Sequence, residues 1–181
     1  MKIIGESGST PLPHGPRSVA PRSASPSHRF RRWILGVCVT LTLAACASAP
    51  KPTQLTGGSI EGSAQLNPSV NKRPSPLVLR IYELKSATAF NSADFVALYE
   101  RDKAELAADI VSREEIILQP GESRPVAAKT LAPEVKFIGV MGAFRDLERA
   151  QWRSVVAVLP GQKQRVTIRA DGLAVSVTVA K

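Results

Sequence analysis

Residues 165–179 have the sequence RVTIRADGLAVSVTV, and this stretch decides the fold class. Apolar side chains occupy every second position on both sides of the turn dipeptide Asp171-Gly172: Val166, Ile168, Val175, Val177 and Val179. Because successive side chains of a strand point to opposite faces, this period of two indicates two strands, each with one buried face. The sequence therefore predicts an antiparallel hairpin at the C-terminal end of the chain.

Strand patterns continue from this hairpin toward the N-terminus. Apolar alternation or short apolar runs predict six further strands: 60–66, 77–82, a strand ending at 118, 124–129, 135–140 and 152–159. The dipeptides Pro120-Gly121 and Pro160-Gly161 mark turns, because proline followed by glycine suits the centre of a type II turn. Short strands separated by such regular turn signals predict an all-β fold, a β-sandwich of about eight strands.

Residues 86–108 interrupt the strand pattern. Aromatic and apolar side chains recur here at helical spacing, and they include Phe90, Phe95 and Tyr99. Ser92 is the predicted N-cap of the helix, and a second short helix is expected over residues 102–108. We expect this small helical insertion to pack its aromatic stripe against the sandwich instead of binding a ligand.

The first 45 residues have the features of a signal peptide with an atypical N-terminal extension. A basic cluster at 29–32 precedes 13 mostly apolar residues, 33–45. A helix that crosses a bilayer needs ~20 residues, so this run is too short to span one. It ends in Leu43-Ala44-Ala45-Cys46, which resembles a bacterial lipobox, where the cysteine is acylated and the chain is cut before it. We therefore expect lipid on Cys46.

The residue after Cys46 is Ala47 and not aspartate, which by the bacterial sorting rule implies the outer membrane with the domain in the periplasm. Residues 46–58 contain two prolines and the pair Gly57-Gly58, a composition typical of a flexible tether. The rest, 59–181, is long enough for one domain.

Cleavage at Cys46 changes the charge and the chemistry that remain. The leader carries six of the 24 basic and one of the 15 acidic residues, which leaves 18 and 14 and a net charge of +4. This charge is too low to indicate nucleic-acid binding. Both histidines, His14 and His28, and Cys38 leave with the leader. The mature chain therefore has no Ser-His-Asp or Cys-His arrangement and no usual zinc site, and we predict no catalytic, cofactor-binding or metal-binding residue and no small-molecule substrate.

Glu114 and Glu115 are the acids that most suggest a carboxylate pair for hydrolysis. As neighbours in a predicted strand they point to opposite faces, so they cannot flank one bond. The prediction for both is a solvated strand edge.

The connection between the first two predicted strands is unusually long and rich in proline. Ten residues with three prolines exceed the two to five residues common between adjacent strands. Prolines restrict the backbone, so a partner would bind such a loop at a lower ordering cost. Composition alone leaves a partner-binding loop and a solvated connector equally open for these residues: Asn67, Pro68, Ser69, Val70, Asn71, Lys72, Arg73, Pro74, Ser75 and Pro76.

Several runs in this order and spacing resemble the TssJ family, the outer-membrane lipoproteins of the type VI secretion system. The runs are Arg73-Pro74-Ser75-Pro76, Tyr82-Glu83-Leu84, residues 90–99, Pro120-Gly121-Glu122, Ile138-Gly139-Val140, Ala143-Phe144-Arg145-Asp146 and Trp152-Arg153. With the lipobox, the resemblance covers nearly all of the mature chain.

The resemblance implies a transthyretin-like β-sandwich and a non-enzymatic role in an envelope-spanning secretion complex. It also implies that residues 67–76 bind the C-terminal periplasmic domain of the inner-membrane component TssM. One alternative is a carbohydrate-binding or other envelope-assembly lipoprotein, and sugar binding would need exposed aromatic rings. The other is a hydrolase that uses only carboxylates, which would need two acids facing each other across a cleft.

Overall fold

Two β-sheets form the framework of the protein in the computed structural model, which describes residues 51–181. One sheet, called here the β1 sheet, has the order β4-β1-β8-β9, and β5 also pairs with β1. Its strands are β1 (Gln54–Gly62), β4 (Ser123–Val126), β5 (Lys129–Thr130), β8 (Lys163–Asp171) and β9 (Ala174–Ala180). The other, the β2 sheet, has the order β3-β2-β6-β7. Its strands are β2 (Leu77–Leu84), β3 (Ile110–Leu118), β6 (Phe137–Ala143) and β7 (Arg153–Ala157).

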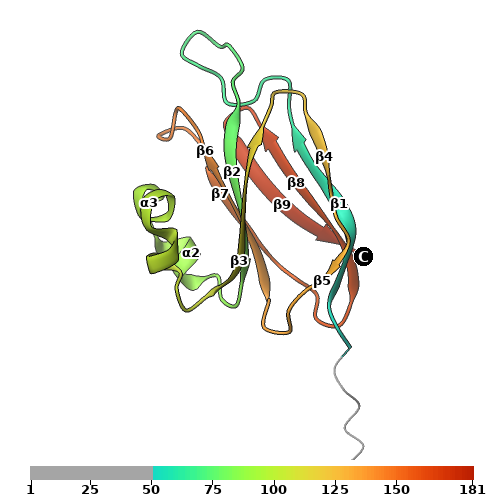
Figure 1. The fold of residues 1–181 in the computed structure, drawn as a ribbon. Coiled ribbons are helices and arrows are strands. Elements are labelled where there is room, and N and C mark those ends of the chain that lie inside the picture. Colours follow the sequence, from blue (N-terminus) through green and yellow to red (C-terminus); the bar gives the residue numbers. More distant parts are fainter. Residues whose placement is uncertain (1–50) are drawn as a thin grey trace, which may run out of the picture. The chain divides into compact units, whose positions relative to one another are not determined.

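The predicted all-β sandwich is confirmed, with nine strands in the described part of the chain because β5 is an additional short one (Figure 1). The C-terminal hairpin lies where the alternation predicts it, with Asp171 opposite Ala174. Gly172 has φ +55° and takes the first of the two turn positions, where positive φ is needed. The run at 135–140 corresponds to β6, which pairs with β2 on one side and β7 on the other, so it is central as predicted.

The first strand differs from its prediction. β1 begins at Gln54, four residues before the predicted end of the tether at 58, and it ends at Gly62 instead of 66. Leu55 belongs to the buried core, and a bulge lies between Leu55 and Gly58. A Cβ added at Gly58 would lie 1.9 Å from the carbonyl oxygen of Val166, so this glycine lets β1 and β8 approach closely. The composition of residues 46–58 predicts flexibility, whereas Gly58 allows tight packing of β1 against β8.

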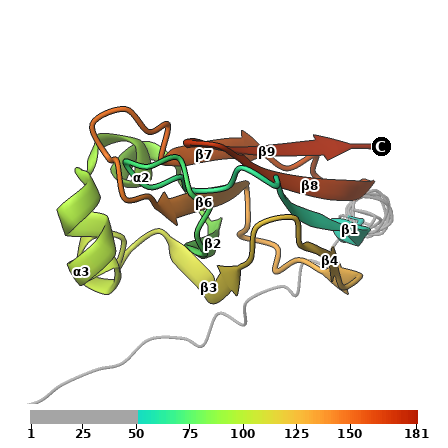
Figure 2. The ribbon, with the colours of Figure 1, turned by 90° about the horizontal axis from the view of Figure 1, so that it is seen from above.

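Both faces of the β2 sheet are covered. Leu77, Leu79 and Ile81 face the β1 sheet in the main core cluster, as the sequence predicts. Tyr82 and Leu84 point the other way and pack with the helices α2 (Thr88–Ser92) and α3 (Phe95–Glu105). Both helices lie beside the β2 sheet, on the side away from β1 and β8 (Figures 1 and 2).

The helical insertion is confirmed, but its internal boundaries were wrong. Ser92 is the last residue of α2, and the N-cap of α3 is Asp94, whose carboxylate accepts a hydrogen bond from the Ala97 amide at 2.7 Å. The backbone leaves helical geometry at Arg101, so the predicted second helix is the last turn of α3 after a kink. Neither helix of the described region is long and apolar enough to cross a membrane. Residues 49–181 make one compact unit with its own core, so we expect this unit to fold alone.

Candidate partner-binding loop

The connection between β1 and β2 projects from one end of the sandwich (Figure 1). The β8–β9 turn and the β6–β7 connection (residues 144–152) lie at the same end, whereas β1 begins at the opposite end. The predicted partner-binding residues 67–76 make up most of this connection, which runs from 63 to 76.

Asn67 holds the base of the loop. It is only 2% exposed and has φ +46°, a left-handed conformation that asparagine tolerates better than most residues. Its side-chain amide donates to the Pro76 carbonyl at 2.8 Å, and its side-chain oxygen accepts from the Arg145 amide at 2.9 Å. Its own backbone amide donates to the Gly172 carbonyl at 2.8 Å. One residue therefore ties together three connections at this end.

Ser75 completes the base from the other side of the loop. Its hydroxyl donates to the Asn67 carbonyl at 2.5 Å, and its amide donates to the Leu66 carbonyl at 3.0 Å. Asn67 and Ser75 are both buried, so their role is to hold the loop and not to meet a partner.

The tip of the loop is a turn closed on Ser69. The Lys72 amide donates to the Ser69 carbonyl at 2.8 Å, and the Ser69 amide donates to the Arg73 carbonyl at 2.9 Å. Val70 at this tip is 102% exposed, as open as an isolated residue. The residues available to a partner are those on the surface: Val70, Asn71, Lys72, Arg73, Pro74 and Pro76, with Pro68 and Ser69 half-buried.

We expect Asn67→Ala to lower the free energy of unfolding by about 2–3 kcal/mol. It removes two part-buried side-chain hydrogen bonds, to the Pro76 carbonyl and from the Arg145 amide, and it puts a residue with a Cβ at positive φ. Urea unfolding measures the change, and Asn71→Ala at the exposed tip is the matched control, expected to change stability by less than ~0.5 kcal/mol. Equal stability of the two variants would contradict the bracing role of Asn67.

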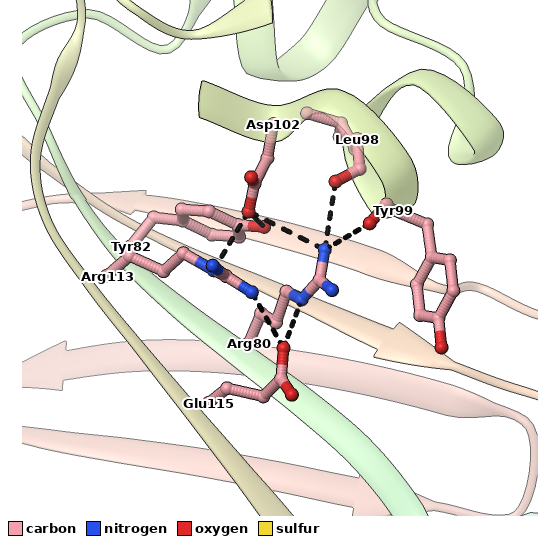
Figure 3. Close-up of polar contacts among 7 residues, drawn as sticks. All are labelled: Arg80, Tyr82, Leu98, Tyr99, Asp102, Arg113 and Glu115. Carbon is pink, nitrogen blue, oxygen red and sulfur yellow. Dashed lines mark hydrogen bonds and ion pairs between the residues drawn. The ribbon is translucent and has the colours of Figure 1, made fainter. Parts of the chain in front are cut away.

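A second polar cluster lies under α3 and fixes the helix to the β2 sheet (Figure 3). The Asp102 carboxylate accepts from the Tyr82 hydroxyl at 3.0 Å and pairs with Arg113 at 2.9 Å and Arg80 at 3.5 Å. Glu115 pairs with the same two arginines at 2.6 and 2.7 Å. The arginines thus bridge one acid on the helix and one on β3.

The electrostatics of this cluster are those of a structural site. The Arg80 guanidinium, which donates to Glu115, holds the pKa of that carboxyl below its usual range, with Arg113 adding to the effect. Burial raises the pKa of Tyr82 to about 12, and the charge of Asp102 contributes. A general acid would need a raised carboxyl pKa, so Glu115 is held in the wrong state for that role. The prediction of a solvated strand edge was incomplete for Glu115, because its carboxylate forms ion pairs with Arg80 and Arg113.

We expect Asp102→Asn to destabilise the protein by about 3 kcal/mol, because it leaves two partly buried guanidinium groups short of a counter-charge. Glu105→Gln, at the exposed end of the same helix, is the control and is expected to cost less than ~0.5 kcal/mol. Chemical denaturation of both variants checks this, and an unchanged free energy of unfolding for Asp102→Asn would show that this carboxylate does not help to hold α3.

The aromatic side chains of the insertion are engaged with one another. Tyr99 stacks on Phe95 at 5.4 Å between ring centroids, and the Arg80 guanidinium lies 4.8 Å from the Tyr99 centroid. Phe95 meets Trp152 edge-on, and Arg153 lies over the Trp152 ring. Tyr99 is 40% exposed, but each of these rings packs against another ring or a guanidinium group, which favours a structural role over a sugar-binding one. Within residues 51–181 no three acidic, histidine or cysteine side chains gather as a metal ion would require.

Comparison with known proteins identifies the class. The sequence model of the family described as type VI secretion lipoprotein (VasD, EvfM, TssJ) matches residues 56–173. The chain is 35% identical to the type VI secretion lipoprotein TssJ1 from Pseudomonas aeruginosa, with a TM-score of 0.67 over 72% of this chain and 98% of that one. The chain belongs to this family of secretion lipoproteins, the TssJ family.

Two further solved structures are similar. A chain of a type VI membrane complex is 31% identical, with a TM-score of 0.58 over 72% of this chain and all of that one (100%). A chain in a structure of the type VI secretion protein TssM C-terminal domain from EAEC is 30% identical, with a TM-score of 0.54 over 68% of this chain and 98% of that one. A search of curated proteins found no match.

Proposed function

We propose that this lipoprotein is a non-enzymatic component of the type VI secretion membrane complex that binds the C-terminal periplasmic domain of TssM through the exposed residues of the loop 67–76, which Asn67 and Ser75 hold in place. The observation that carries the proposal is the braced loop, whose tip presents Val70 to solvent beside Lys72 and Arg73. A pre-formed loop loses little conformational freedom when it binds. The likeness to chains from a type VI membrane complex and from a TssM structure supports a partner of this kind.

Anchoring is part of the same proposal. Cleavage before Cys46 and acylation of its thiol would hold the protein on the outer membrane, with the domain in the periplasm; these N-terminal residues lie outside the described part of the structure. Gln54 is eight positions after Cys46, a reach of at most ~29 Å when extended. β1 then leads from its start to the loop end of the sandwich, ~30 Å farther for its nine residues. The loop therefore lies at the end of the sandwich opposite the start of β1, where it would be available to an inner-membrane partner.

Site-specific photo-crosslinking in the bacterium tests the proposal. A photoreactive amino acid at Val70 is expected to give a light-dependent adduct with TssM, because this side chain is fully exposed at the loop tip. The same amino acid at Thr178, exposed on β9, is the matched control and should give none. Adducts of equal yield at the two positions, or none at Val70, would refute the assignment.

A further inference from the structure

A groove lies between the loop tip and the β6–β7 connection. It has a volume of about 830 Å³, and the two connections form its walls. Half-buried Leu147 and Leu173 supply apolar surface, and Pro68 and Val70 add more from the loop side. A volume of this size admits a short peptide segment and not only one side chain.

The two walls are fixed to each other. The Arg145 amide donates to the Asn67 side chain at 2.9 Å, and the Asn67 amide donates to the Gly172 carbonyl. These bonds set the spacing between the loop and the connection before any partner arrives, so binding in the groove needs little reordering.

The rim of the groove carries unpaired positive charge. Asp146 pairs with Arg149 at 3.5 Å, whereas no ion pair within the described chain engages the other two cations that line the groove, Lys72 and Arg145. Glu148 is the one acid of the groove that likewise has no such pair. Two cations without an ion pair against one such acid favour an acidic ligand.

We propose that the partner site is this composite groove and not the loop alone, and that it receives a segment of the partner with an apolar side chain flanked by acidic residues. The apolar side chain contacts Val70 and Leu147, and the acidic residues meet Lys72 and Arg145. This inference rests on the proposed function, since it names the second wall of the same binding site.

Charge reversal at Arg145 tests the second wall. Arg145→Glu is expected to weaken binding of the purified TssM C-terminal domain at least about tenfold at low salt, mainly through slower association, and the loss should shrink as salt rises. Arg145 is exposed, so the variant should unfold at the same temperature as the parent. Arg165→Glu makes the same charge change on β8 near the opposite end of the sandwich, and it should bind within about twofold of the parent.

A double-mutant cycle tests whether one partner group touches both walls. Val70→Ala and Leu147→Ala should each weaken binding, and the double variant should lose at least about threefold less than the product of the single losses, because both truncations remove contacts with one side chain. Thermal unfolding of each variant checks that Leu147→Ala stays folded.

The outcomes separate the inference from the function on which it rests. If loop-tip variants lose binding while Arg145→Glu and Leu147→Ala bind as the parent does, the loop acts alone and the composite groove is wrong. If the loss of affinity in the double variant equals the product of the two single losses, then no partner side chain contacts both Val70 and Leu147, and the proposed position of the partner segment is wrong. Failure of the unchanged domain to bind would instead refute the proposed function itself.

Discussion

Replacing residues 70–74 with a short Gly-Ser link is expected to weaken binding to the TssM C-terminal domain by at least about 100-fold, which is ~2.7 kcal/mol. The replacement removes the exposed tip, including Val70, Lys72 and Arg73, but keeps Asn67 and Ser75 at the base. The residues removed are all exposed, so the free energy of unfolding should change by less than ~0.5 kcal/mol. A binding titration and a thermal unfolding curve on the same preparation measure both quantities.

The matched control alters a surface connection at the other end of the sandwich. Pro133-Glu134, both exposed between β5 and β6, replaced by Gly-Ser should leave binding unchanged. The domain used must begin before Gln54, because a start at 58 would remove Leu55 from the core and the first part of β1. If a folded loop variant binds with undiminished affinity, the loop is not part of the binding site.

Cys46→Ser is expected to abolish membrane anchoring. The acyl chains require the thiol, and stable anchoring requires more than one chain, so no other group of the mature protein can substitute. Metabolic labelling with palmitate followed by membrane fractionation should find no label and no mature protein in the outer membrane. The sandwich should still fold, because Cys46 lies outside residues 49–181.

The other cysteine of the chain provides the control for this variant. Cys38→Ser removes a thiol within the predicted leader and should leave labelling and fractionation unchanged. Labelled, outer-membrane Cys46→Ser protein would show that the anchor lies elsewhere.

The strands that the sequence predicts well are those whose pattern is local. In the β8–β9 hairpin, alternation marks the buried face and the turn dipeptide limits the connection, so both strands follow from a few neighbouring residues. β1 is different, because the pair Gly57-Gly58 is compatible both with a flexible tether and with the close approach of two strands. The Val166 carbonyl, which distinguishes these two roles, belongs to a residue more than a hundred positions along the chain.

In the candidate site, too, local features could be predicted from the sequence and long-range contacts could not. Proline content and length single out residues 67–76, because both are properties of the segment itself. The bracing of Asn67 by Arg145, 78 residues away, depends on sheet topology and has no local signal. The second wall of the groove is therefore beyond sequence reasoning, although Arg145 and Asp146 lie in a run that resembles the family.

A titration of the unmodified domain, residues 47–181, with the purified TssM C-terminal domain tests the proposed role most directly. We expect saturable binding whose association rate falls as salt is raised, while the dissociation rate changes less, because Lys72, Arg73 and Arg145 attract an acidic surface. A folded domain that shows no binding at any salt concentration would contradict the proposed role.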